Sequence, residues 1–244
     1  MKNIILISAL CAFIAFTQTR CVKQNNPPPK ADTVFVNETA TKTLVVKPGP
    51  DDAQDCLVFS VPAGADANQV SNPDFVASAW SYAEEGWPDA AIRGFIEFTA
   101  LDGLADSAQI RSATLYLYGL DVNAATAIWQ GNSDYPGSPY GSTGNQCWLK
   151  RVTANWGQNS ITWNNMPSTT DIHEATIPES TSQWNNNDTV DVTQMVQDIV
   201  NTGQNYGFCL QLQTEQTYRD LAFAGSRNPD STRWPKLIVT YSIH

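Results

Sequence analysis

The stretch Ile110–Gly119 alternates apolar and polar side chains more regularly than any other part of the chain. One phase holds Ala113, Leu115 and Leu117, and the other holds Thr114, Tyr116 and Tyr118. Successive side chains of a β-strand point to opposite faces, so this alternation predicts a strand with one buried face. Strands of this kind are expected where two sheets pack face to face.

Similar strand signals recur between turns rich in Gly, Pro and Asn. The segments expected to be strands are 43–46, 56–61, 93–98, 148–153, 160–163, 176–178, 206–213 and 233–241. One helix is expected from Asp191 or Thr193 to Asn201, because its apolar residues share one face and Gly203 follows it. The pattern predicts an all-β protein, a jelly-roll β-sandwich with one short helix near the C-terminal end.

The N-terminal residues differ in composition from the rest of the 244-residue chain. Lys2 precedes an apolar run from Ile4 to Phe16. Such a run is typical of a secretion signal and is shorter than the about 20 residues that a membrane-spanning helix needs. The expected organisation is a signal peptide at 1–20, a tether at 21–42 and one sandwich domain at 43–244.

Cys21 follows the apolar run at the distance where a bacterial lipoprotein carries its lipidated cysteine. The polar, Pro-rich stretch 23–30 resembles the tether of such a lipoprotein. Arg20, however, stands where those signals usually carry a small residue, which leaves soluble secretion open. We therefore expect an exported protein, either an outer-membrane lipoprotein that touches the membrane only through a lipid on Cys21, or a free extracellular protein.

Three cysteines, Cys56, Cys147 and Cys209, lie beyond Cys21. Exported proteins often pair such residues in disulfides, but buried unpaired thiols are an equally good interpretation. Cys147 alternates in phase with Leu149 and is expected to face inward. No Cys-x-x-Cys or Cys/His spacing in the sequence indicates a zinc site.

Charge restricts the partners of this chain. Hydrophobic residues make up 42 % of it, enough for a sizeable core, and charged residues only 16 %, with a net charge of −10. Non-specific contacts to nucleic acid phosphates require clustered Lys and Arg, so no nucleic acid is expected as a partner.

Catalytic motifs are absent from the sequence. It contains no Gly-x-Ser-x-Gly element, and His173-Glu174 lacks the second histidine of a zincin helix. Paired carboxylates could serve a glycosidase, and the candidates are Asp51 with Asp52, Glu84 with Glu85, and Glu97. With 24 acidic residues such pairs arise by chance. We expect that the chain is not an enzyme.

Asp51, Asp52 and Asp55 form a small acidic group in a turn flanked by Pro and Gly. Calcium takes carboxylate and carbonyl oxygens, so a structural calcium site is one interpretation. A polar turn with Asx-type hydrogen bonds is the simpler one. No other cofactor is expected.

Aromatic residues supply the strongest functional signal. The chain has eight tryptophans, and residues 130–146 read as a long loop of a kind that is often functional. Sugar rings pack their apolar faces on aromatic side chains, while nearby polar groups bind the hydroxyls. Core packing is the alternative, and is preferred for Trp156, Trp163 and Trp234. The candidate ligand-binding aromatics are Trp80, Tyr82, Trp87, Trp129, Tyr135 and Tyr140.

An acidic glycan would also need local positive charge. Lys150, Arg151, Arg219 and Arg227 are the candidate residues, and surface salt bridges would explain them as well.

Several segments together resemble one known family. They are Arg93-Gly-Phe-Ile-Glu-Phe98, Ile110-Arg-Ser-Ala-Thr-Leu-Tyr-Leu-Tyr118, Ile161-Thr-Trp-Asn-Asn-Met-Pro167, Tyr206-Gly-Phe208 and Arg233-Trp-Pro-Lys-Leu-Ile-Val-Thr-Tyr241. This set resembles the DNRLRE-domain family from about residue 43 to residue 241. The name-giving region reads Asp89-Ala-Ala-Ile-Arg93 here and keeps only the arginine.

The resemblance implies a jelly-roll sandwich on exported or surface-attached bacterial and archaeal proteins. Some members are carbohydrate-binding modules beside polysaccharide lyases, including alginate-binding ones. We therefore expect a non-catalytic secreted or surface-anchored module that binds polysaccharide or another surface glycan. The alternative is a structural or adhesive surface or matrix protein. It would self-assemble by donating residues 33–46, which include an expected early strand at 33–37.

Overall fold

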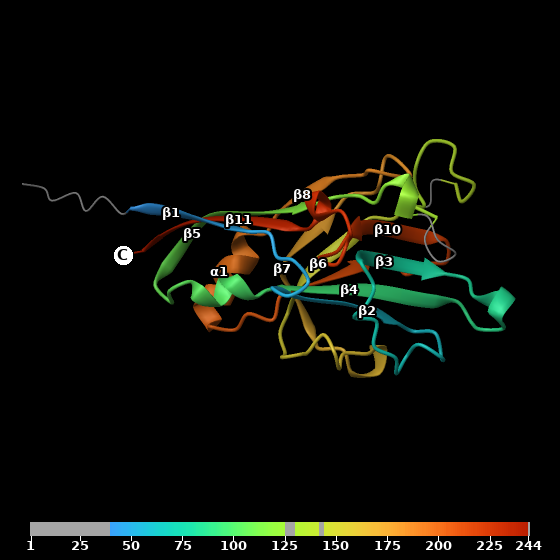
Figure 1. The fold of residues 1–244 in the computed structure, drawn as a ribbon, viewed down its shortest axis with the longest axis horizontal. Helices are drawn as coiled ribbons and strands as arrows, with labels where there is room; N and C mark the ends of the chain where they lie inside the picture. Colours follow the sequence, from blue (N-terminus) through green and yellow to red (C-terminus); the bar gives the residue numbers. More distant parts are fainter. Residues whose placement is uncertain (1–39, 125–129, 142–143, 244) are drawn as a thin grey trace, which may run out of the picture. The chain divides into compact units, whose positions relative to one another are not determined.

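Two antiparallel β-sheets and one α-helix make up the part of the protein that the computed structural model describes, residues 40–124, 130–141 and 144–243 (Figure 1). The expected fold class, an all-β sandwich with one short helix, is confirmed. The residues of the expected signal peptide, Cys21, the expected early strand at 33–37 and Trp129 lie outside the described residues. No helix of the described segments has the length and apolar composition to cross a membrane.

The smaller sheet has four strands. In spatial order they are β1 (Thr41–Val46), β11 (Lys236–Ile243), β5 (Ala108–Leu117) and β8 (Asp188–Asp191). The alternation expected around Ile110–Gly119 is confirmed in β5, where Ala113, Leu115 and Leu117 are fully buried.

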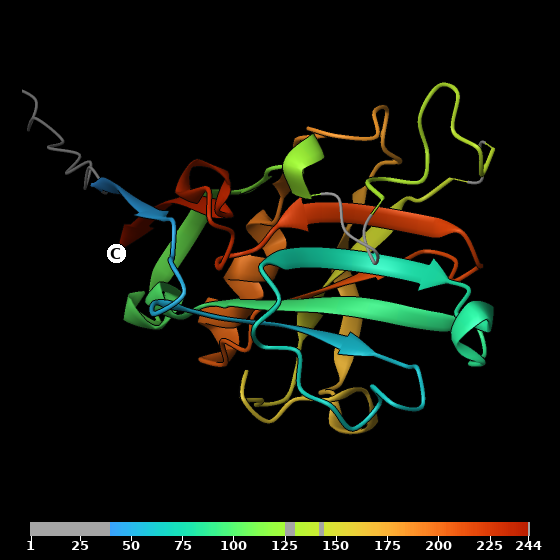
Figure 2. The same cartoon turned by 45° about the vertical axis from the view of Figure 1, so that its right-hand side comes forward.

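The larger sheet has seven strands. In spatial order they are β10 (Arg219–Ala224), β3 (Asp74–Trp80), β4 (Ala90–Phe98), β9 (Phe208–Leu212), β6 (Cys147–Val152) and β7 (Thr169–Ile177), and β2 (Ala53–Phe59) also pairs with β4. Figure 2 shows β10, β3, β4 and β2 as neighbouring ribbons.

The larger sheet divides along β4. The first part of this strand pairs with β3 up to Ile92, and the later part pairs with β9 from Gly94 onward. Because β2 pairs along the other side of β4, β3 and β9 must share one edge of it. At Gly94 the Phe75 ring of β3 packs so closely that a Cβ would lie 2.8 Å from it. The absence of a side chain at Gly94 therefore leaves room for the Phe75 ring of β3 directly against β4.

The main core lies between the sheets and under the helix. Phe75, Phe98 and Phe208 of the larger sheet are buried in one cluster with Leu115 of β5. Helix α1 (Thr193–Thr202) adds Met195, Val196 and Ile199 to the same cluster. The helix ends as expected at Gly203, whose φ of 63° is left-handed.

Several parts of the strand prediction were incomplete or wrong. β3 and β10 were not predicted, because both of their faces are buried and their sequences carry no alternation. The four-residue strand β8 was not predicted either, and only the last part of β7 was. The strand expected at 160–163 is wrong. That segment enters a short 3₁₀ turn, Trp163–Asn165, where the Thr162 backbone N–H donates to Asn165 Oδ1 at 2.7 Å.

Two glycines test how closely the backbone just before β9 approaches β4. Gly207 has a φ of 71° and would place a Cβ 2.1 Å from the Ile96 carbonyl oxygen, whereas Gly203 has a φ of 63° and open space around it. We expect Gly203→Ala to lower the free energy of unfolding by about 1–2 kcal/mol, from the left-handed backbone alone. Gly207→Ala should cost about 4 kcal/mol or more, because the clash adds to that strain. Urea unfolding measures both, and equal losses would contradict this packing.

Candidate functional site

Three aromatic rings from distant parts of the chain meet at one end of β3 and β10. Trp80 ends β3, Tyr218 directly precedes β10, and Tyr140 lies in the loop before β6. The Trp80 ring lies edge-on to both tyrosines, with centroid distances of 4.8 Å to Tyr140 and 5.4 Å to Tyr218. The two tyrosines stack at 5.6 Å. We refer to these three residues as the aromatic cluster.

Tyr218 is the most exposed member, at 45 %. Its φ of 69° is left-handed, which is rare for a bulky side chain. Neighbouring contacts hold the turn that carries it: Thr217 donates its hydroxyl to Asp89 at 2.5 Å, and Glu215 binds Arg93 through two hydrogen bonds of 2.7 and 3.2 Å. An exposed ring kept in a strained conformation is a feature of binding sites more than of packing.

Buried polar side chains fix the loop that carries Tyr140. Ser133 donates its backbone N–H to the Asp220 carbonyl at 3.0 Å, and its hydroxyl accepts from the Asp220 N–H at 2.9 Å. Asn132 accepts from the Ala222 N–H at 2.9 Å, and Asn145 donates to the Asp220 carbonyl at 2.6 Å. We call these bonds the loop anchor. They attach both ends of the loop to β10 and so place Tyr140 beside Trp80.

An open hollow of about 530 Å³ adjoins the cluster. Its lining residues are Trp80, Ser81, Tyr82, Ala83, Glu84, Glu85 and Tyr218. A 3₁₀ turn, η1 (Ala83–Glu85), ends at Gly86 in the left-handed conformation and presents both glutamates to solvent. Apolar rings and carboxylates thus share one surface.

Tyr82 adds a hydroxyl to the lining of this hollow, as do Ser81 and Tyr218. Burial, with Asp220 and Glu85 nearby, raises the pKa of Tyr82 to about 12, so its hydroxyl keeps its proton at neutral pH. Asp220 itself is buried, and burial together with Asp74 holds its pKa well above the usual range. Its Oδ1 has no hydrogen-bond partner within the described residues.

The structure brings together some of the expected aromatic residues. Trp80 and Tyr140 belong to the cluster, and Tyr82 lines the hollow. Trp87 is 37 % exposed beside the hollow, and its backbone N–H donates to the Tyr82 carbonyl at 3.0 Å. Tyr135 instead lines a separate hollow of about 390 Å³ with Asp134 and Ser138.

Tyr218 was missed by sequence reasoning, because it lies next to a strand whose sequence gives no strand signal. The glutamates at 84 and 85 were considered only as a catalytic pair. In the sequence the two glutamates lie between Trp80 and Trp87, and Tyr218 is followed by Arg219. These neighbours alone are too weak a signal to identify them as site residues.

The four candidate cations do not form a basic groove with these rings. Lys150 on β6 binds Asp171 at 2.6 Å and Glu174 at 3.4 Å. Arg151 pairs with Asp198 at 3.8 Å. Arg219 follows Tyr218, but its guanidinium donates to Gln216 Oε1 at 2.9 Å.

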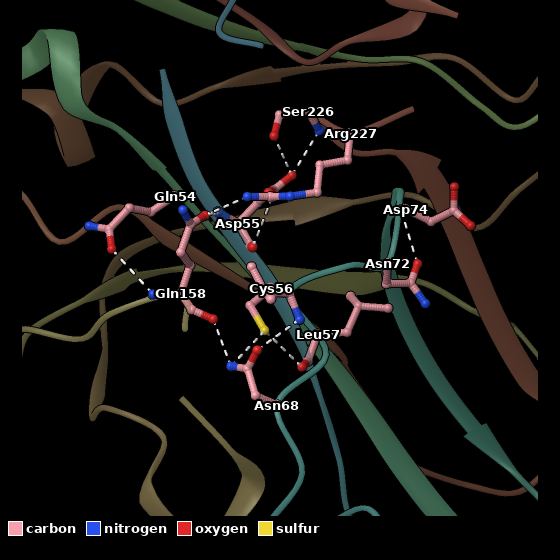
Figure 3. Close-up of polar contacts among 11 residues, drawn as sticks. Gln54, Asp55, Cys56, Leu57, Asn68, Asn72, Asp74, Gln158, Ser226 and Arg227 are labelled. Carbon is pink, nitrogen blue, oxygen red and sulfur yellow. Dashed lines mark hydrogen bonds and ion pairs between the residues drawn. The ribbon is translucent and has the colours of Figure 1, made fainter. Parts of the chain in front are cut away.

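Arg227 takes part in a different, buried network (Figure 3). It forms an ion pair with Asp55 and donates to Gln158 Oε1 at 2.7 Å. Asp55 also accepts from the Ser226 N–H at 2.8 Å and from the Ser226 hydroxyl at 2.7 Å. Both residues therefore connect β2 to the loop after β10 and have a structural role here.

The acidic turn does not assemble as a calcium site in this arrangement. Asp51 and Asp52 are exposed, whereas Asp55 is buried against Arg227. In residues 40–124, 130–141 and 144–243, no group of three His, Cys, Asp or Glu side chains is arranged to hold a metal ion.

The cysteines of the sandwich are buried and unpaired. Cys147 faces inward as expected, and Cys56 and Cys209 lie in a second apolar cluster. Burial raises the pKa of Cys56 to about 11 and that of Cys209 to about 12. Since the thiolate is the reactive form, these thiols are inert packing residues.

A β-sandwich that presents exposed aromatic rings beside a polar hollow has the features of a carbohydrate-binding module. The sequence comparison agrees: the model of carbohydrate-binding module family 96 matches residues 135–241. The chain is therefore similar to a non-catalytic binding module over the part that includes Tyr140, Tyr218 and strands β6 to β11. Trp80 and the two glutamates lie outside the matched range. No curated protein matches the chain.

Glu97, near the C-terminal end of β4, is a buried acidic residue whose ionisation is linked to folding. It is buried on β4 and accepts from Gln54 Nε2 at 3.0 Å. Burial, together with the charge of Asp102, raises its pKa from 4.5 to about 7.

The contribution of Glu97 to stability should therefore fall as pH rises from about 4.5 to about 7. In this window the unfolded chain releases the Glu97 proton and the folded chain keeps it, which costs about 1.4 kcal/mol per pH unit. Glu97→Gln removes this term. Its free energy of unfolding, relative to the wild type, should increase by about 3 kcal/mol between pH 4.5 and pH 7.5. Urea unfolding followed by tryptophan fluorescence provides the values, and a pH-independent difference would refute the assignment.

Proposed function

We propose that this chain is a non-catalytic, exported or surface-anchored module that binds polysaccharide through the aromatic cluster and the adjoining hollow. The observation that carries the proposal is the convergence of Trp80, Tyr140 and Tyr218 from three separate segments, with Tyr218 exposed. The match to a carbohydrate-binding module family supports it.

The physical argument rests on stacking. A pyranose ring that covers on the order of 60 Å² of aromatic surface gains roughly 1.5 kcal/mol from apolar burial. The flanking glutamates can accept hydrogen bonds from the sugar hydroxyls, and the Tyr82 hydroxyl can donate one. Because the loop anchor and the Arg93–Glu215 pair already order the site, little conformational entropy is lost on binding.

Export and membership of the DNRLRE group belong to the same proposal. Lys2, the apolar run 4–16 and Cys21 support export with or without a lipid anchor. The motifs Arg93–Phe98 and Ile110–Tyr118, which form most of β4 and β5, support the DNRLRE assignment.

A structural or adhesive role through strand addition is the second candidate. β1 is an edge strand of the smaller sheet, and its Val45 is 60 % exposed. Donation of residues 33–46 to another chain would require Thr41–Val46 to leave β11, with which it pairs in this structure. A partner strand could instead add to the open side of β1.

Removal of single rings tests the binding site. Trp80→Ala and Tyr218→Gly should each weaken binding about tenfold or more to any polysaccharide that retards the wild type in a gel. Tenfold corresponds to a loss of about 1.4 kcal/mol in binding free energy. Tyr218→Gly should fold at least as well as the wild type, because glycine adopts the left-handed backbone freely. Affinity electrophoresis in laminarin, xylan, pectin and alginate gels measures binding, and thermal unfolding checks the fold.

Tyr116→Ala is the matched control, because this half-buried tyrosine lies on β5 against Lys236 and outside the cluster. It should bind like the wild type. If the Trp80→Ala and Tyr218→Gly variants fold and keep full binding, the aromatic cluster is not the binding site. No retardation on any glycan, together with concentration-dependent polymers in light scattering, would favour strand addition.

A further inference from the structure

The hollow beside the aromatic cluster carries negative charge. Glu84 and Glu85 are exposed on its wall, together with Trp80 and Tyr218. Asp89 lies nearby, since Thr217 donates to it at 2.5 Å. Among the described residues that line the hollow, none is a lysine or arginine.

Neighbouring cations offset this charge only in part. Arg93 is neutralised by Glu215 through two hydrogen bonds. The Arg219 guanidinium donates to the neutral Gln216 and keeps its charge, but it is not among the residues that line the hollow. The remaining candidate cations, Lys150, Arg151 and Arg227, are held by carboxylates elsewhere in the sandwich.

The hydroxyl groups of a glycan and its carboxylates or sulfates interact differently with these glutamates. Ionised glutamates only accept hydrogen bonds, and sugar hydroxyls can donate to them. A uronate carboxylate or a sulfate cannot donate a hydrogen bond to a glutamate. Charge repulsion also lowers its binding affinity about threefold for each glutamate that lies about 7 Å away in water.

We propose that this site selects uncharged polysaccharides and discriminates against glycans that carry carboxylates or sulfates. The inference rests on the proposed function and specifies its ligand class. It also replaces the expectation of a basic groove for an acidic glycan with the opposite charge preference.

The test uses the double variant Glu84→Gln/Glu85→Gln on the full chain. Laminarin serves as the uncharged ligand and alginate as the uronate ligand, in affinity electrophoresis at low salt. The variant should bind alginate about five- to tenfold more tightly than the wild type, because two repulsive charges are gone. It should bind laminarin about two- to threefold more weakly, because neutral amides accept weaker hydrogen bonds than carboxylates. In about 0.5 M salt the alginate gain should largely disappear.

Asp51→Asn/Asp52→Asn is the matched control, because it makes the same change in net charge on an exposed turn outside the hollow. It should leave both affinities at the wild-type values. An equal gain for alginate in both double variants would show an effect of net charge alone and would overturn the inference.

Two further outcomes separate the inference from the proposed function. If the wild type binds alginate at least as tightly as laminarin and Trp80→Ala abolishes this, the site binds glycans but the charge preference is wrong. If the wild type binds neither laminarin nor xylan, pectin or alginate, the proposed function itself fails.

Discussion

Paired hydrogen bonds between Ser133 and the backbone of Asp220 close the outer edge of β10. Without them this edge would expose backbone donors and acceptors that β3, on the other side, cannot satisfy. Asn132 and Asn145 extend the same contact, and all three polar side chains are buried. These bonds cover the first part of this edge and order the long loop, while the Tyr118 carbonyl accepts from the Ala224 N–H further along it. The position of Tyr140 against Trp80 and Tyr218 depends on the loop anchor.

Charged groups serve mainly to hold the sandwich together. The Asp55–Arg227 pair joins β2 to the loop after β10, and the Arg93–Glu215 pair fixes the turn that carries Tyr218. With these cations engaged, the recognition proposed for the aromatic cluster rests on ring stacking, hydroxyl hydrogen bonds and exposed carboxylates. Such a surface suits a sugar chain better than a catalytic reaction, which needs paired groups with defined proton-transfer geometry.

The sequence predicted those features that depend on local pattern. Alternation located β5, and helical spacing with Gly203 located α1 within a residue or two. β3 was missed because it is buried on both faces, and Tyr218 because its exposure depends on a turn held from β4. The partners of Asp55 and Lys150 are distant in sequence, so composition alone could not show that the expected calcium and glycan ligands are engaged in ion pairs. Trp80, Tyr82 and Tyr140 were chosen as candidates from their residue types, but only folding shows that Trp80 lies against Tyr140 and shares a hollow with Tyr82.

The most direct measurement is a titration of ¹⁵N-labelled protein with a soluble uncharged oligosaccharide, followed by amide and indole NMR signals. The Trp80 indole and the amides of Gly137 and Gly141 in the loop of Tyr140 should shift together and give one dissociation constant. The indoles of Trp156 and Trp234, which donate to the carbonyls of Tyr206 and Asn228, should stay unchanged. Shifts centred on Trp156 or Trp234, with none at Trp80, would contradict a glycan site at the aromatic cluster.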